Sequence, residues 1–245
     1  MTAAMRTPHV EHDLPKTPQH LYNARMAVQL AVTWKLVRAA MQIPLPGRVA
    51  QMSMAVRPRP GDRPDLPDPC PREAGVLILL YERDGRLLLP LTRRTLTVEM
   101  HSGQISLPGG AREPQDHSFE QTALRETREE LGIPDAAISV LGPLTPLYIP
   151  PSQFCVYPYV GRTPGAFPLC PDPDEVAEVI EVYLDHLLEP ATRQENTHFR
   201  DERRYDVPLY VVANHRVWGA TAMILAEFLA LLRAARALPA CRPQD

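Results

Sequence analysis

Two short apolar runs, separated by a polar turn, follow the proline-rich stretch of the chain. Residues 75–81 read GVLILLY and residues 86–92 read RLLLPLT, with an Asp-Gly pair between them. Apolar runs joined by such a turn predict a β-hairpin with one buried face. Further apolar runs predict later strands at 137–148, 154–160, 176–184, 207–213 and 215–218.

Two longer segments carry the periodicity and the end signals of helices. In the first, Ser118 is placed to cap a helix, Gln121 to reach back as its capping-box partner, and Gly132 to end it. This predicts a helix over 119–131. The second segment, over 220–237, is amphipathic. Strands interleaved with two long helices predict an α/β fold built in layers.

One side of the first helix gathers acidic side chains. At about 100° per residue, Glu126, Glu129 and Glu130 fall within roughly one third of the helix circumference. Leu124 and Leu131 face the opposite way and are expected in the core. Carboxylates three or four residues apart repel one another, so the cluster is unfavourable in an isolated helix. It is either a solvated acidic face or a site for a hard divalent cation.

A Gly-Gly pair ahead of the helix favours the metal site. Gly109 and Gly110 stand between an extended segment and the polar loop that leads into the helix. Their bare backbone lets an anion, or the face of the helix, approach closely. Mg²⁺ is bound through a few carboxylates and keeps positions for waters and substrate phosphates. We therefore expect a divalent cation at the acidic face.

The same stretch resembles the Nudix hydrolase signature, in which a glycine and an acidic residue precede R-E-x-x-E-E-x-G and an aliphatic residue. The matching positions are Arg125, Glu126, Glu129, Glu130, Gly132 and Ile133. Asp116 follows Gly110 at the expected spacing, but eight residues separate Asp116 from Arg125. That distance is one residue longer than in the general signature.

The longer spacing resembles the variant found in coenzyme A diphosphatases. The runs at 91–95, 101–104 and 107–110 resemble the same subfamily. The chain also departs from it, because arginine, phenylalanine and serine are common there at the positions of Glu99, Leu107 and Thr95, respectively. The whole signature therefore resembles that of the Nudix family. Only part of the sequence flanking it resembles that of the coenzyme A diphosphatases.

The resemblance implies a Nudix-type α/β/α sandwich with a mixed β-sheet, and the residues before it add an N-terminal helical extension. It implies metal-dependent hydrolysis of a diphosphate bond in a nucleotide derivative, with Mg²⁺ or Mn²⁺ as cofactor. The expected substrate is coenzyme A or acyl-coenzyme A, cut into 3′,5′-ADP and 4′-phosphopantetheine, acylated where the substrate is. An alternative is ADP-ribose or another nucleoside diphosphate compound. A non-enzymatic Nudix ligand sensor is the second class, and the intact glutamates favour an enzyme over it.

The resemblance also distributes roles within the signature. Glu126 and Glu130 are the leading metal ligands, one helical turn apart, and Glu129 is the third. Arg125 either contacts a substrate phosphate or pairs with Glu129 to hold the carboxylates in register. The resemblance favours the second role for Arg125.

The general base is expected either on the signature helix or in a later loop. Glu175 and Glu178, in the segment PDPDEVAEVIEV, are the later candidates. Acidic residues near the start of an edge strand give the same pattern without any catalytic role. Both interpretations of these two glutamates stay open.

The segment before the glycines supplies the expected substrate contacts. Arg94 offers a planar guanidinium suited to gripping a phosphate in bidentate fashion, at either the 3′-phosphate or the diphosphate. His101 is expected to hydrogen-bond its own loop rather than act as an acid. Gly109 and Gly110 complete the substrate-binding set, and Trp218 is expected in the core.

Composition excludes some classes of protein. The chain has 245 residues, of which 44% are hydrophobic, enough to build a sizeable core. Its net charge of −3, with the basic residues scattered, gives no electrostatic footprint for nucleic acid. We therefore expect a small-molecule nucleotide diphosphate as substrate and no nucleic acid partner.

The four cysteines form no C-x-x-C pair. They are Cys70, Cys155, Cys170 and Cys241. Their spacing indicates neither a zinc site nor a disulfide framework. Unpaired cysteines are consistent with a reducing, cytoplasmic location.

The chain divides into an N-terminal helix with a proline-rich linker, residues 1–71, and a Nudix hydrolase domain, residues 72–245. Prolines forbid a continuous helix or a central strand in the linker part, 44–71. A helix is predicted over 21–41, where charged residues interrupt the apolar pattern too often for a membrane span. It is expected to pack on the domain or on a second subunit, as in a possible homodimer. The opening residues lack the pattern of a secretory signal.

Overall fold

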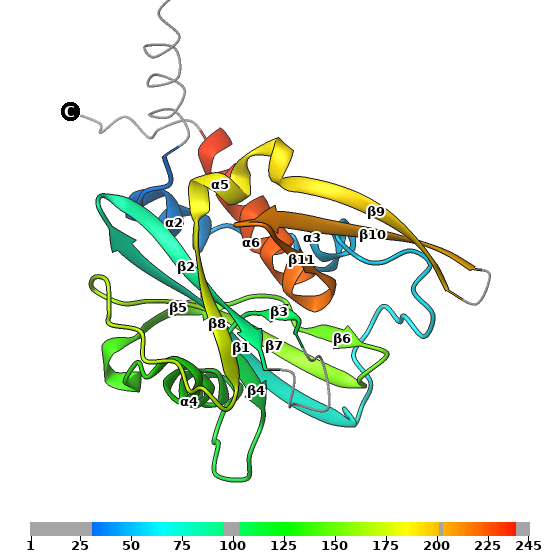
Figure 1. Ribbon diagram of the computed structural model, residues 1–245, viewed down its shortest axis with the longest axis horizontal. Helices are drawn as coiled ribbons and strands as arrows, with labels where there is room; N and C mark the ends of the chain where they lie inside the picture. Colours follow the sequence, from blue (N-terminus) through cyan, green and yellow to red (C-terminus); the bar gives the residue numbers. More distant parts are fainter. Residues whose placement is uncertain (1–30, 96–102, 201–202, 239–245) are drawn as a thin grey trace, which may run out of the picture. The chain divides into compact units, whose positions relative to one another are not determined.

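The computed structural model of the chain describes residues 31–95, 103–200 and 203–238. Within them, a sheet of eight strands forms the centre of the fold (Figure 1). Its strands are β1 (Arg72–Arg83), β2 (Arg86–Arg94), β3 (Ile105–Ser106), β4 (Gly109–Ala111), β5 (Ser139–Pro143), β6 (Leu147–Ile149), β7 (Phe154–Arg162) and β8 (Val176–Tyr183). The pair β1–β7 is parallel and the other pairs are antiparallel, so the sheet is mixed.

A second, three-stranded antiparallel sheet and five helices complete the described fold. The strands of this sheet are β9 (Arg193–Arg200), β10 (Arg203–Val212) and β11 (His215–Trp218). The helices are α2 (Trp34–Ala40), α3 (Gly47–Met52), α4 (Phe119–Leu131), α5 (Leu184–Leu188) and α6 (Gly219–Ala237). Two short 3₁₀ turns are η1 (Asp135–Ala137) and η2 (Pro190–Thr192).

Alternation along β1 shows how the layers are arranged. Leu77 and Leu79 point into a core that also contains Ala123 and Leu131 of α4. Ile78 and Leu80 point to the other face, into the larger core that includes α6. Helix α4 thus covers one face of the main sheet, and α6 covers the other together with α2 and α3 (Figure 1). The predicted α/β/α sandwich is confirmed.

The first hairpin has the predicted turn. Asp84 and Gly85 both have positive φ, 53° and 73°, and Arg83 lies opposite Arg86 in the ladder. Positive φ at both central turn positions matches the right-handed twist of the flanking strands, and the Asp-Gly pair tolerates it. The predicted hairpin is therefore confirmed, with longer strands than its apolar runs indicated.

Two strand predictions need correction. The strand predicted over 137–148 is interrupted, because β5 ends at Pro143 and β6 begins at Leu147. Strand β9 was not predicted at all, since its sequence RQENTHFR shows no alternation of apolar and polar residues. It is held by its backbone ladder to β10, which does not depend on apolar side chains.

The proline-rich stretch, which the sequence marks as a linker, packs against the domain as a wrapped arm. Its first part forms the short helix α3, and Met54 and Ala55 after it are fully buried. Further along, Arg57 and Asp206 exchange two backbone hydrogen bonds, of 2.9 and 2.8 Å. Residues from Val32 onward form one compact unit. The proposed domain boundary coincides with the first residue of β1, Arg72, and stays a prediction.

The helix predicted over 21–41 is only partly within the described residues, because residues 1–30 lie outside them. Thr33 is extended and caps α2 by accepting the Leu36 N–H at 3.3 Å. A continuous helix through residues 31–33 is therefore wrong, and a separate helix begins at Trp34. No helix in the described part of the chain is long and apolar enough to cross a membrane.

The cysteine prediction is corrected by a disulfide between Cys70 and Cys155. Parallel pairing of β1 with β7 places Glu73 opposite Cys155, so Cys70, just before β1, lies beside it. Spacing along the chain gave no sign of this pair because 85 residues separate its members. Cys170 is free and exposed, and Cys241 lies outside the described residues. The argument for a reducing compartment from unpaired cysteines therefore fails.

Candidate metal-binding active site

Helix α4 begins and ends where its sequence predicts. The Ser118 hydroxyl accepts the Gln121 N–H at 3.2 Å, and Gly132 takes the left-handed conformation with φ 70°. The Gln121 side chain reaches back as predicted, but it accepts the N–H of His117 at 2.8 Å rather than that of Ser118. The two capping hydrogen bonds and the C-terminal glycine thus fix where α4 begins and ends, and with that the face on which its acidic residues lie.

Glycines allow α4 to lie close to the main sheet. A Cβ on Gly75 would overlap the backbone of α4 at Phe119, and a Cβ on Gly110 would overlap the Glu126 carboxyl group. A Cβ on Gly109 would overlap β1, and this residue has a φ of 149°. The sequence allows either an anion or the face of a helix to approach the Gly-Gly pair. In the structure, the face of α4 does so. A contact of Gly109 or Gly110 with substrate stays a prediction.

Three carboxylates converge beside this contact. Glu126, Glu130 and Glu175 each place one oxygen within 4.8 Å of the others. Glu126 and Glu130 are one turn apart on α4. Glu175 is brought to them because the chain before β8 bonds back to the end of α4: the Cys170 N–H donates to the Leu131 carbonyl at 2.9 Å. The cluster thus joins two segments that are distant in sequence.

The cluster carries more negative charge than the chain neutralises. Glu130 is 1% exposed, and its Oε2 has no hydrogen-bond partner among the described residues. Burial raises the pKa of Glu130 to about 8, against the opposing effect of Arg94, and burial also raises the pKa of Glu126. An all-oxygen group with an unsatisfied buried carboxylate fits a hard divalent cation such as Mg²⁺ or Mn²⁺.

Glu129 lies apart from the cluster. Its side chain is exposed and accepts Arg125 Nη1 at 2.8 Å and Arg128 Nη2 at 3.4 Å. The structure therefore places Glu175, rather than the predicted Glu129, with the two leading ligands. A role for Glu129 in binding metal stays a prediction.

Arg125 holds a saturated network of hydrogen bonds. Its Nε and Nη2 donate to the two carboxylate oxygens of Asp116, at 3.1 and 3.0 Å. Its Nη1 donates to Glu126 at 2.9 Å and to Glu129 at 2.8 Å, and Nη2 also reaches the Ala111 carbonyl at 2.9 Å. The pairing with Glu129 agrees with the role that the resemblance favoured, and each nitrogen of this guanidinium donates to an oxygen of the described chain.

Asp116 is the partner whose role sequence reasoning missed. It is 5% exposed and accepts from Arg125, from the Glu113 N–H at 2.9 Å and from Thr122 Oγ1 at 3.0 Å. The Arg125 guanidinium, followed by these other donors, lowers the pKa of Asp116 to about 2. Asp116 occupies the acidic position of the signature, but the sequence alone assigned no function to that position. In the folded protein it anchors Arg125.

Arg94 faces the carboxylate cluster. Its Nη1 lies 3.6 Å from Glu130 Oε1, and its Nε is buried without a hydrogen-bond partner among the described residues. The guanidinium therefore stands beside the candidate metal site. A phosphate bound at the cluster would be within its reach.

The two candidate bases occupy different surroundings. Glu175 is exposed and belongs to the carboxylate cluster. Glu178 instead accepts Arg93 Nε at 2.9 Å and lies 3.3 Å from His215 Nε2. The Arg93 hydrogen bond lowers the pKa of Glu178, which makes it a weaker proton acceptor. The structure thus separates Glu178 from the cluster.

Two other predicted residues have different outcomes. His101 lies outside the described residues, so its role in hydrogen-bonding a loop stays a prediction. Trp218 was expected in the core, and this is wrong because the residue is 43% exposed. It ends β11, immediately before α6, where only part of its ring is covered.

Comparison with known proteins identifies the family. The sequence matches the NUDIX domain family over residues 71–202, so the chain belongs to the Nudix family. A protein of Photorhabdus laumondii named "Uncharacterized Nudix hydrolase NudL" is 38% identical over 154 residues, which are 63% of this chain and 81% of that protein. A Yersinia pestis protein of the same name is 38% identical over 63% of this chain and 76% of its own length.

Among solved structures, the Nudix hydrolase RenU from M. smegmatis is similar, with a TM-score of 0.45 and 16% identity over 69% of this chain and 89% of that one. A likeness of this size carries no inference about the reaction. The family and the named relatives make this chain a Nudix hydrolase. Nudix hydrolases act on small nucleotide-derived substrates and generally use divalent ions such as Mg²⁺ or Mn²⁺.

Proposed function

We propose that this Nudix hydrolase cleaves a diphosphate bond with a divalent cation held by Glu126 and Glu130. The observation that carries the proposal is the buried Glu130 carboxylate, which has one unsatisfied oxygen in a group of three converging carboxylates. A buried charge without a partner is costly, and a cation removes that cost. Arg94 is too far from Glu130 to do so fully, since their nearest atoms are 3.6 Å apart.

Mg²⁺ or Mn²⁺ bound there would neutralise phosphoryl oxygens and lower the pKa of a water molecule. The chain supplies the remaining functions. Arg125 keeps Glu126 in place through the hydrogen bond from Nη1. Glu175 belongs to the same carboxylate cluster, lies on the segment before β8 and is exposed. We therefore assign it as the general base, which accepts the proton of the attacking water. Glu178 is engaged by Arg93 and receives no step.

The proposed substrate is coenzyme A or acyl-coenzyme A, with 3′,5′-ADP and 4′-phosphopantetheine, or its acylated form, as products. The runs at 91–95, 101–104 and 107–110 and the longer signature spacing support this choice. ADP-ribose or another nucleoside diphosphate compound is the alternative within the same chemistry. A ligand sensor without turnover would not need the unsatisfied carboxylate cluster.

A substrate panel tests this proposal. Purified chain with Mg²⁺ or Mn²⁺ is incubated separately with coenzyme A, ADP-ribose, NADH and nucleoside triphosphates, and the products are identified by mass spectrometry. Release of 4′-phosphopantetheine supports the coenzyme A assignment. Turnover of ADP-ribose alone supports the alternative, and binding without turnover on the whole panel supports the sensor. Glu130→Gln serves as the control for a contaminating hydrolase.

Arg94 gives a sharper test of how the substrate lies. Because its guanidinium stands beside Glu130, we assign Arg94 to the diphosphate rather than to the 3′-phosphate. Arg94→Ala should then lower kcat/KM about tenfold or more, and equally, for coenzyme A and for dephospho-coenzyme A. A loss confined to coenzyme A would move Arg94 to the 3′-phosphate.

Cytoplasmic location and a homodimer are further proposals. The Cys70–Cys155 disulfide removes one argument for the cytoplasm, and residues 21–30 of the helix predicted over 21–41, the candidate dimer arm, lie outside the described residues. Light scattering of the full chain and of a chain lacking residues 1–30 tests the dimer. A lower mass after truncation supports it, and an unchanged mass refutes the arm.

A further inference from the structure

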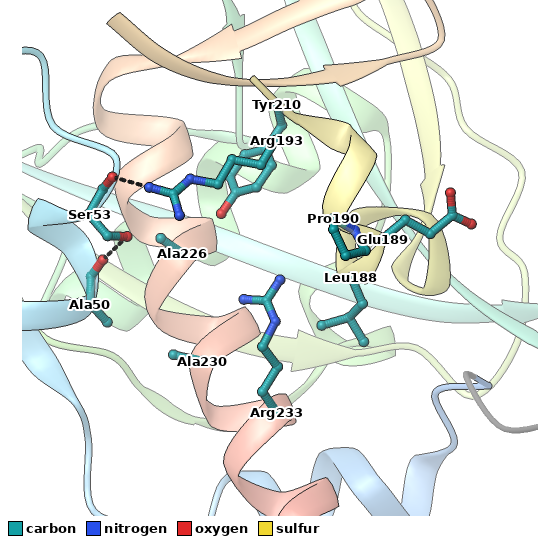
Figure 2. A pocket seen from close by; sticks show the side chains of 10 residues that line it. All are labelled: Ala50, Ser53, Leu188, Glu189, Pro190, Arg193, Tyr210, Ala226, Ala230 and Arg233. Atoms are coloured by element: carbon teal, nitrogen blue, oxygen red, sulfur yellow. Dashed lines mark hydrogen bonds between the residues drawn. The ribbon is translucent and has the colours of Figure 1, made fainter. Parts of the chain in front are cut away.

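A cavity lies on the α6 side of the main sheet, among α3, α5, β10 and α6. It has a volume of about 410 Å³ and includes no residue of the carboxylate cluster or of the Arg125 network. Its polar side chains include Arg193, Tyr210 and Arg233, and its apolar wall includes Leu188, Ala226 and Ala230 (Figure 2). A guanidinium from the start of β9 and another from α6, both on exposed residues, therefore face one pocket that is open to solvent.

Arg233 has no carboxylate partner in the described part of the chain. It makes no hydrogen bond or ion pair there, and Figure 2 shows its guanidinium turned along α6 toward the cavity. Arg233 is exposed, so its N–H groups are available to a ligand. An anion in the cavity would give them an acceptor.

Arg193 is also free of carboxylates among the described residues. One of its N–H groups donates to the Ser53 carbonyl at 2.9 Å, which orients the guanidinium and leaves its other donors available. The acidic residue of the lining, Glu189, is directed away from both arginines in Figure 2 and pairs with His186 at 3.4 Å. The cavity therefore carries two positive charges that no carboxylate of its lining neutralises.

Tyr210 adds a neutral donor. Its residue is only 3% exposed, and burial raises the pKa of its hydroxyl, which therefore keeps its proton at neutral pH. The hydroxyl oxygen points into the space between the helices in Figure 2, and it has no hydrogen-bond partner among the described residues. The hydroxyl oxygen is accessible to solvent, unlike the unsatisfied Glu130 oxygen, so it can donate to a ligand in the cavity.

We propose that this cavity is a second ligand site, which binds a small molecule carrying a phosphate monoester beside a short apolar part. Two guanidinium groups and a hydroxyl, from three separate elements, offer more donors than one carboxylate can accept, and they match a dianionic phosphate. Leu188, Ala226 and Ala230 provide the wall for the apolar part. The carboxylate of the lining, Glu189, is directed away from the arginines, so the site binds its ligand without the cation of the first site.

Calorimetric titration of the full chain tests the site. The probes are inorganic phosphate and n-butyl phosphate, and EDTA is present so that no cation can draw phosphate to the carboxylate cluster. Both probes should bind at one site, with butyl phosphate binding more tightly because of the apolar wall. Arg233→Gln should weaken both at least about tenfold, since it removes a charge-assisted donor. Arg233→Lys keeps the charge but loses the planar guanidinium. Its affinity for both probes should lie between those of the parent chain and Arg233→Gln.

A matched control comes from the same helix. Arg236→Gln removes an equal charge from α6 at a position that does not line the cavity, and it should leave binding unchanged within about twofold. Arg193→Gln should weaken binding as Arg233→Gln does, and its melting temperature shows whether loss of the Ser53 contact has altered the fold. Arg233 has no such contact among the described residues, so its variant tests the site alone.

Three results would overturn the proposal. They are an absence of binding by either phosphate, equal binding by the parent chain and Arg233→Gln, and binding of butyrate as tight as that of butyl phosphate. The last result would make the cavity a carboxylate site. None of these measurements depends on turnover, so a failure of the proposed hydrolysis and a failure of this site are distinguished.

Discussion

Two sides of α4 carry carboxylates at similar spacing but differ in how their charge is balanced. On one side, Arg125 donates hydrogen bonds to Asp116, Glu126 and Glu129, and each nitrogen of its guanidinium group has an oxygen acceptor. On the other side, Glu130 is buried with an unsatisfied oxygen, and the cation that faces it, Arg94, is 3.6 Å away. The first side is complete within the chain, and the proposed cation would complete the second.

Glu126 connects the two sides. One of its oxygens accepts Arg125 Nη1 at 2.9 Å, and the carboxylate also belongs to the group with Glu130 and Glu175. A satisfied ion-pair network thus holds one member of an unsatisfied cluster. This difference between the two sides implies that substitutions can separate stability from catalysis. Changes on the Arg125 side should unfold the protein, and changes on the Glu130 side should inactivate it.

The largest effect is expected for Glu130→Gln. Removing a metal ligand costs several kcal/mol of transition-state stabilisation, so kcat should fall about a thousandfold with the substrate identified from the panel. Without metal, the melting temperature should not fall, because the variant replaces a buried carboxyl group that lacks a partner by a neutral amide of the same size. Steady-state kinetics at saturating Mg²⁺ and thermal melts in EDTA measure both. Parent-like turnover would show that Glu130 is no ligand.

On the other side of α4, Asp116→Ala should destabilise the fold by about 3 to 5 kcal/mol, because it leaves Arg125 buried without its main partner. Urea unfolding followed by circular dichroism measures the change, with Glu113→Ala as an exposed control in the same loop. A loss below about 1 kcal/mol for Asp116→Ala would contradict the anchoring role.

Glu175 and Glu178 form a matched pair that separates catalytic from structural acids. Glu175→Gln should lower kcat by about a hundredfold or more and remove the acidic limb of the pH–rate profile, as loss of a general base does. Glu178→Gln weakens partly exposed pairs with Arg93 and His215, so stability should change by at most about 1 kcal/mol and kcat by a few fold. The reverse order of effects on kcat would assign the base to Glu178.

The smallest effect concerns pH. Arg125 lowers the pKa of Asp116 to about 2 in the folded chain, whereas an unfolded aspartate has a pKa of about 3.9. Its contribution is therefore fully present above pH ~4 and is lost as pH falls toward 2, because the unfolded state binds the proton first. Urea unfolding between pH 3 and 6 should show a stability gap between the parent and Asp116→Asn that narrows with acid. A constant gap would contradict the shift.

Local sequence determined the elements whose bonds join near neighbours. Helix α4 was predicted residue for residue because its start and end depend on Ser118 and Gly132, within a few residues of the turns that they close. The first hairpin was predicted because Asp84 and Gly85 alone supply its turn. The signature glutamates were found for the same reason, since helical spacing places them on one face.

Contacts between distant segments decided the rest. Whether Glu129 or Glu175 joins the ligands depends on how the chain before β8 bonds back to the end of α4, which no local pattern encodes. Likewise, the disulfide depends on the parallel pairing of β1 with β7, and the arginine cavity on where α6 lies relative to β9. Such contacts depend on packing of the whole chain, whereas caps and turns are fixed by the free energy of a few adjacent residues.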